Sequence, residues 1–189
     1  MLIELSFDPN RLDESGSEES FIIEMAPIDE MPHSVYWFLS QVDRGFFDRC
    51  GFHQNPGHVI QGGPVPNFIW APNQNLRGVF EDKALTSVLF QEYSPEFPHE
   101  KYTIGYAGRP GGPDFYISTT DNTKIHGPFG QVGYVDPSEA DPCFAKVVSG
   151  FEAVDRMMNI PVQPRDKNFS MISFVAITSM KILQPKEIL

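Results

Sequence analysis

Hydrophobic and polar residues alternate near the start of the chain. Ile3, Leu5 and Phe7 lie two residues apart, and a second apolar segment follows at residues 21–25. A period of two residues is typical of a strand with one buried face. Residues 13–20, between the two segments, are acidic and rich in serine. The pattern therefore predicts two strands joined by a solvated turn.

The period changes to that of a helix in two places. Residues 33–44 carry Val35, Phe38 and Val42, which are spaced three and four residues apart. This spacing places the three side chains on one helical face. A proline precedes the segment and a glycine follows it, as is common at helix ends. Residues 151–158 repeat the pattern over a shorter length, so the sequence predicts two helices.

Further short apolar runs are separated by glycine and proline. They predict strands near residues 59–60, 102–107, 115–117, 144–148 and 172–183, and Phe52-His53 lead into a turn at residues 54–57. The segments 64–100 and 118–142 carry many turn residues and predict irregular connections. About eight short strands separated by turns favour a barrel or a sandwich, and two helices can cover the ends of a barrel. No repeat or linker is visible, so residues 1–189 predict a single domain.

Composition and charge exclude several classes of function. The 189 residues include 14 basic and 25 acidic side chains, for a net charge of −11 and a pI near 4.8. This balance argues against nucleic-acid binding and against an anionic membrane surface, because both need Lys and Arg. Apolar runs are too short to span a bilayer and no leader segment is recognisable, so we expect no membrane contact.

The two cysteines, Cys50 and Cys143, leave the compartment open. They form no CxxC motif and no Cys/His ligand spacing, which argues against a structural zinc site. Two free thiols would fit a cytoplasmic protein, whereas a disulfide would fit a secreted or luminal one.

Six strings of residues follow one another over almost the whole chain. They are residues 25–39, 45–48, 52–63, 91–108, 115–117 and 144–155. Among them are Gly45-Phe46-Phe47-Asp48 and Gln61-Gly62-Gly63. Together these strings resemble the cyclophilin family of peptidyl-prolyl cis-trans isomerases. The resemblance implies a mainly β fold, a closed eight-stranded antiparallel barrel capped by two α-helices. It also implies that the protein binds proline-containing peptides and needs no cofactor.

The family's catalytic pattern is altered in this chain. Rotation about an X–Pro bond has a barrier of roughly 18–20 kcal/mol. In the family an Arg donates a hydrogen bond to the twisted amide nitrogen, and a Gln holds the flanking peptide. The resemblance places Gln54, or Asn55 depending on the gap, at the Arg position, and Gln61 at the Gln position. A neutral donor forms a weaker hydrogen bond, so we expect weak or absent isomerase activity.

The resemblance also assigns a set of binding residues. They are His58, Val59, Gly105, Asp114, Tyr116 and Ile125. Tyr116 stands where the family has a pocket Phe, and Asp114 where a Gln is usual. Residues 124–127 replace a string that carries a Trp in the family, so we expect weak or no binding of cyclosporin. Asp141 lies by count where the family has a pocket His.

Two other readings of the charged and ligating residues compete with this assignment. Arg109 either replaces the missing Arg or is an exposed loop residue paired with an acid such as Asp114. The histidines His53, His58 and His126 would lie near the pocket rim, where three imidazoles could bind zinc. Chance proximity is the simpler account, and we predict no metal site.

Two classes of function follow from these observations. The first is a divergent isomerase that retains weak activity on X–Pro bonds. The second is a non-catalytic module that binds a peptide or takes part in an assembly, with the long segments 64–100 and 118–142 available for contacts.

Overall fold

The computed structural model describes residues 2–8, 19–48, 50–64, 76–84, 87–89, 91–131, 136 and 138–183. Within these ranges the chain forms eight strands: β1 (Leu2–Asp8), β2 (Glu19–Met25), β3 (Gly51–Gln54), β4 (Val59–Gly63), β5 (Thr103–Tyr106), β6 (Phe115–Ser118), β7 (Cys143–Ser149) and β8 (Ser170–Leu183). It also forms four helices: α1 (Pro32–Asp43), α2 (Leu76–Asp82), α3 (Thr123–His126) and α4 (Phe151–Met158). None of the described helices has the length and hydrophobicity to span a membrane.

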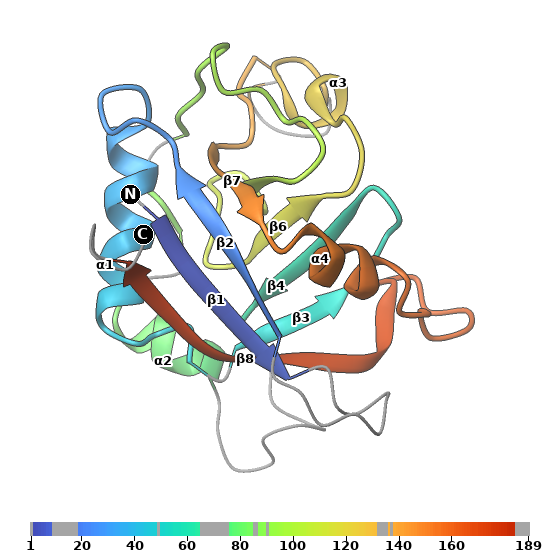
Figure 1. The fold of residues 1–189 in the computed structure, drawn as a ribbon. Helices are drawn as coiled ribbons and strands as arrows, with labels where there is room; N and C mark the ends of the chain where they lie inside the picture. The colour runs from blue at the N-terminus through green and yellow to red at the C-terminus, as the bar shows by residue number, and fades with distance from the viewer. Residues whose placement is uncertain are drawn as a thin grey trace.

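The strands pair antiparallel throughout. Their hydrogen-bonded order is β1-β2-β7-β5-β6-β4-β3-β8, and β8 also pairs with β1, so the order returns to its first strand. Figure 1 shows the strands curling together, with α1 on one side and α4 on the other. The predicted mainly β, antiparallel fold is confirmed. The predicted pairing of the first two strands is also confirmed, while most of the turn at 13–20 lies outside the described residues.

Helices are more numerous than the sequence pattern predicts. The two predicted helices correspond to α1 and α4, but α2 and α3 lie in segments predicted to be irregular. Both additional helices are short, with seven and four residues. A single turn carries no readable period, and α2 contains a glycine, which weakens the helical signal.

Helix α1 is attached to the barrel by aromatic packing. Its first residue, Pro32, has no backbone N–H. An N–H at this position would have no partner within the helix, so the proline costs no hydrogen bond. Phe38, on the buried face, is 0% exposed and packs against Phe47, Phe115 and Phe144 at ring-centroid distances of 5.1, 5.8 and 4.8 Å. This aromatic cluster belongs to the hydrophobic core and joins α1 to the strands.

Candidate functional site

One row of cross-strand neighbours crosses four strands of the sheet. Gln54 of β3 lies opposite Gln61 of β4. Gln61 lies opposite Tyr116 of β6, and Tyr116 lies opposite Gly105 of β5. Directly opposed residues of an antiparallel pair share a face. Because the residues on both sides of Tyr116 belong to the core, this row faces outward.

The lack of a side chain at Gly105 leaves room for the Tyr116 side chain. A Cβ atom at Gly105 would lie 2.6 Å from the Tyr116 hydroxyl oxygen and 2.9 Å from the carbonyl oxygen of Pro142. Both distances are shorter than van der Waals contact, so any larger residue would displace the tyrosine ring. The glycine therefore sets how closely Tyr116 approaches β5.

Tyr116 is covered although it faces outward. It is 1% exposed, and its ring centroid lies 4.7 Å from that of His126. Burial, with Asp141 nearby, raises the pKa of Tyr116, so its hydroxyl stays protonated. That hydroxyl lies 3.2 Å from Nδ1 of His99. Tyr116, expected from the resemblance to stand at a pocket position, is thus a buried tyrosine in contact with His126 and His99.

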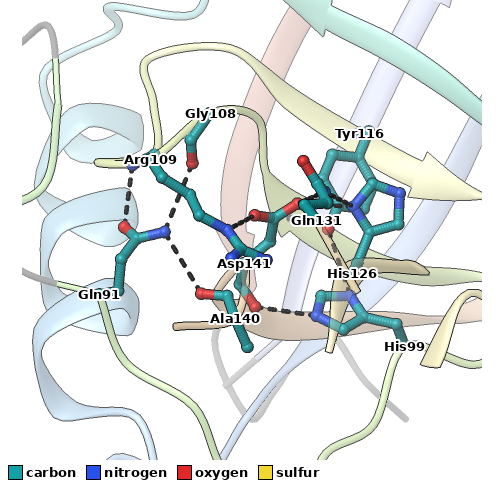
Figure 2. A network of polar contacts seen from close by, with 10 residues as sticks. Gln91, His99, Gly108, Arg109, Tyr116, His126, Gln131, Ala140 and Asp141 are labelled. Carbon is teal, nitrogen blue, oxygen red and sulfur yellow. Dashed lines mark hydrogen bonds and ion pairs between the residues drawn. The ribbon is translucent and has the colours of Figure 1, made fainter. Parts of the chain in front are cut away.

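A buried polar network lies beside Tyr116 and centres on Asp141 (Figure 2). Arg109 Nε donates to Asp141 Oδ1 at 2.8 Å, and His126 Nδ1 lies 2.5 Å from Asp141 Oδ2. Gln131 Nε2 donates to the same Oδ2 at 3.0 Å. The side chains of Arg109 and Asp141 are 1% and 2% exposed. Buried charges persist when they are paired and hydrogen-bonded, so this carboxylate offsets the guanidinium charge.

Gln91 ties together the two loops that carry this ion pair. Its Nε2 donates to the carbonyl oxygens of Gly108 at 3.4 Å and Ala140 at 3.3 Å, the residues just before Arg109 and Asp141. Its Oε1 accepts from the N–H of Gly111 at 2.9 Å. Figure 2 shows this amide bridging the two backbones. Gln91 thereby fixes the separation at which Arg109 meets Asp141.

His58 lies on the outer side of this buried polar network. Its ring stacks on that of His126, with centroids 5.5 Å apart and planes inclined by 19°. Its carbonyl oxygen accepts from Thr119 N–H at 3.0 Å and from Asn122 Nδ2 at 2.7 Å, which holds the loop before β4 in place. Partial burial, followed by the nearby His126, lowers the pKa of His58.

With the outward row and the buried polar network described, the chain can be compared with known proteins. A family model described as cyclophilin type peptidyl-prolyl cis-trans isomerase/CLD matches residues 12–182. The chain belongs to this cyclophilin-type family. No curated protein matches it.

Two crystal structures of a cyclophilin type peptidyl-prolyl cis-trans isomerase from Cryptosporidium parvum share the fold. One, determined in the presence of the dipeptide Ala-Pro, has a TM-score of 0.67 and 17% sequence identity. The other has a TM-score of 0.66 and 18% identity. Both matches cover 97% of this chain and 99% of the crystallised chain.

The geometry separates the two candidates for the family's Arg position. The side chain of Asn55 is engaged elsewhere: its Nδ2 donates to the carbonyl oxygen of Met158 at 2.9 Å, and its Oδ1 accepts from Gly57 N–H at 3.1 Å. Gln54 instead lies in the row opposite Gln61. Of the two, Gln54 is therefore the residue that lies beside Gln61.

The predicted binding residues divide into two groups. His58, Val59, Tyr116 and Gly105 lie at or next to the row, Val59 being 4% exposed. Asp114 directly precedes β6, two residues from Tyr116 and on the same face, and a Cβ at Gly63 would overlap its carboxylate. Ile125 is 44% exposed, whereas its neighbour His126 is the α3 residue that reaches Tyr116. The structure therefore places the first group beside His126, with Asp114 two residues before Tyr116 in the chain and Ile125 exposed on α3.

One expectation for Arg109 is confirmed in part, because its side chain pairs with an acid. The sequence favours an exposed loop residue paired with an acid such as Asp114, but the side chain is buried and pairs with Asp141. The error arises because a loop rich in glycine and proline predicts exposure, while contacts with residues 91 and 140–141 bury it. Its Nε donates to Asp141, close enough to Tyr116 for the guanidinium to influence the pKa of that row residue.

The alternatives for metal and disulfide bonding can be checked against the described residues. No group of three His, Cys, Asp or Glu side chains in the described part of the chain is arranged to hold a metal ion. His53 Nδ1 lies 3.2 Å from the carbonyl oxygen of Gly51. Cys50 and Cys143 are both buried, and neither is joined in a disulfide bond. Burial raises the pKa of Cys143 to about 12, which keeps this thiol protonated and unreactive.

His99 is a site residue that the sequence offers no signal for. Its Nε2 lies 2.8 Å from the carbonyl oxygen of Asp141, which can only accept, so this nitrogen carries the proton. Its Nδ1 then accepts from the Tyr116 hydroxyl. The neutral ring satisfies both contacts, and burial lowers the pKa of His99 to about 4.

This burial predicts a pH dependence of folding. Between pH 6.5 and about 4 the unfolded chain binds a proton on His99 that the folded chain does not. The free energy of unfolding therefore falls as pH decreases through this window, with a contribution from His99 of about 2–4 kcal/mol. Urea titrations at pH 7.5, 6.0 and 5.0 measure the slope. In His99→Phe the slope flattens, and an unchanged slope in that variant would contradict a neutral buried His99.

Proposed function

We propose that residues 1–189 form one divergent cyclophilin-type domain that binds proline-containing peptides and isomerises X–Pro bonds weakly or not at all. The observation that carries this proposal is the outward row, in which the neighbour of Gln61 is the neutral Gln54. The strand order, in which β8 returns to β1, supports a closed eight-stranded barrel as the scaffold. A crystallised relative was studied with the dipeptide Ala-Pro, which supports a proline-containing ligand for this chain.

The chemistry of the reaction explains why a neutral residue weakens the site. As the X–Pro bond twists, its nitrogen loses conjugation and becomes a hydrogen-bond acceptor. A charged donor stabilises that nitrogen roughly twice as strongly as a neutral one. Gln54 offers an uncharged amide, and the nearby Arg109 is neutralised by Asp141. The row can thus hold a peptide through Gln61 while contributing little to the transition state.

A second candidate function is a non-catalytic peptide-binding or assembly module. The burial of Tyr116 favours it, since a ring that is 1% exposed offers almost no apolar surface to a proline. On this proposal the His58–His126 stack covers the position that a proline ring occupies in the family. Peptides would then bind along Gln54 and Gln61 without reaching the depth that isomerisation requires.

The expected partners follow from the same features. We propose a proline-containing peptide or protein client and no cofactor. The net charge of −11 supports the absence of nucleic-acid and membrane contacts. Residues 124–127 supply no Trp near the row, which supports weak or absent cyclosporin binding.

Restoring the charged donor tests the proposed function. We expect wild-type protein to accelerate a protease-coupled proline-peptide reaction only slightly above buffer. Gln54→Arg is expected to raise kcat/KM by about 10²-fold, the usual effect of one preorganised donor. Adding Gln61→Ala to that variant should remove most of the gain, because the peptide then loses its flanking hydrogen bond.

The same measurement distinguishes the two candidate functions. A wild-type rate above buffer that falls in Gln61→Ala supports the weak isomerase. The binding module is supported if the wild-type rate equals that of buffer and the peptide nevertheless shifts the amide NMR signals of the row residues. Full family-level activity in the wild type would contradict the role given to Gln54, and no peptide-induced shift would contradict both.

A further inference from the structure

A groove lies away from the outward row, between the end of β2, helix α1 and the turn at residues 96–97. Its volume is about 810 Å³, and it shares no lining residue with the row. In Figure 1 β2 and α1 lie on the left, whereas α3, which carries His126, lies at the upper right. The groove is therefore a separate surface of the molecule.

The floor of the groove is apolar and partly accessible. Leu39 of α1 and Phe97 are half-buried, and Ile28, in the loop after β2, is 58% exposed. A large aliphatic side chain that is mostly exposed beside two other apolar residues offers area that a ligand can remove from water.

Carboxylates dominate the rim. Three glutamates and one lysine are the charged residues that line the groove, and the lysine, Lys146, pairs with Glu24 at 3.0 Å. The structure pairs no described Lys or Arg with the other two, Glu30 and Glu96. Two negative charges therefore remain uncompensated over an apolar floor.

Hydrogen bonds hold the two walls in place. Glu92 accepts from the backbone N–H groups of His33 at 2.7 Å and Ser34 at 2.6 Å, which joins the start of α1 to the segment before the 96–97 turn. The Ser94 hydroxyl donates to Glu30 Oε2 at 2.8 Å and accepts from Glu96 N–H at 3.3 Å. The Glu30 carboxylate and the backbone that carries Glu96 are thus positioned before any ligand arrives, which reduces the ordering cost of binding.

From this combination we propose that the groove docks a short cationic and apolar peptide segment of a partner protein. An apolar side chain of the partner covers Ile28 and packs between Leu39 and Phe97. Its flanking Lys or Arg residues pair with Glu30 and Glu96. The net charge of −11 increases the rate of encounter with such a segment through long-range attraction. This surface acts independently of the outward row.

The test uses three fluorescein-labelled hexapeptides that contain no proline, so that the outward row is not their target. Their sequences alternate Leu with Arg, with Ser or with Glu. We expect the Arg-Leu peptide to bind in fluorescence anisotropy at low salt about tenfold more tightly than the Ser-Leu peptide, since a surface ion pair contributes up to about fivefold. The Glu-Leu peptide should not bind. Amide NMR shifts should appear at residues 24–30 and 96–97.

Variants separate the groove from general charge attraction. The pair Glu30→Lys and Glu96→Lys should weaken Arg-Leu binding about tenfold, and Ile28→Ser should weaken it by a similar factor. The matched control reverses two exposed acids elsewhere, Glu139→Lys and Glu152→Lys, and should change affinity less than twofold. Glu30→Lys also removes the hydrogen bond from Ser94, so circular dichroism and the melting temperature are measured for every variant. Glu96→Lys alone keeps that hydrogen bond and should still weaken Arg-Leu binding several-fold.

Three outcomes would overturn the proposal. Equal binding of all three peptides would exclude charge complementarity, and an equal loss in the Glu139 and Glu152 control would assign the attraction to net charge. A concentration-dependent dimer that Ile28→Ser abolishes in sedimentation would assign the groove to a second copy of this chain. A failed isomerase assay leaves this result unaffected, because the peptides carry no X–Pro bond.

Discussion

Replacing Asp141 with alanine is expected to lower the free energy of unfolding by about 3–5 kcal/mol, the usual cost of removing one partner from a buried ion pair. Asp141 and Arg109 are 2% and 1% exposed in their side chains. The variant leaves the guanidinium charge buried without the carboxylate that accepts from its Nε. It also removes the oxygen beside His126 Nδ1. Urea denaturation monitored by circular dichroism measures the loss.

A double variant separates the charge effect from lost packing. In Arg109→Met with Asp141→Leu both charges are absent, and apolar replacements of a buried pair are often neutral or stabilising. We therefore expect most of the stability to return. The matched control is the exposed pair of Lys101 and Asp155, 43% and 46% exposed, where Lys101→Gln should cost less than about 1 kcal/mol. A double variant as unstable as Asp141→Ala would contradict the argument.

Phe38→Ala is expected to cost about 3–5 kcal/mol of the free energy of unfolding, through lost burial and the cavity left behind. Phe38 is 0% exposed and contacts four other aromatic rings. Those rings come from β5, β6, β7 and the turn after α1, so they cannot all close on the vacated space. Urea denaturation with an unchanged m-value measures the cost.

Two further variants of α1 make this prediction specific. Phe38→Leu keeps most of the volume and should cost less than the alanine variant. Tyr36, two residues earlier on the same helix, is 69% exposed, and Tyr36→Ala should stay within about 0.5 kcal/mol of wild type. If Phe38→Ala and Tyr36→Ala cost the same, the aromatic cluster would not be what attaches α1 to the barrel.

The sequence by itself determined the elements whose pattern is local. Period-two alternation and helical spacing predicted the first two strands, α1 and α4, because each depends on residues close in the chain. The ordered strings of the cyclophilin family predicted that Gln54, Gln61, Tyr116 and Gly105 belong to one site, and they form one cross-strand row. Short helices such as α3 were missed because a single turn has no period.

Only the tertiary structure decided what covers that row. The Arg109–Asp141 ion pair joins residues 32 positions apart, and Gln91 and Tyr116 reach it from two other segments. Each of these residues alone reads as a loop or strand residue with many possible neighbours. Their burial follows from three loops that meet over β6, and a charge becomes buried only where its partner arrives with it. The members of the row can therefore be predicted from the sequence. That a buried polar network covers Tyr116 follows only from the folded structure.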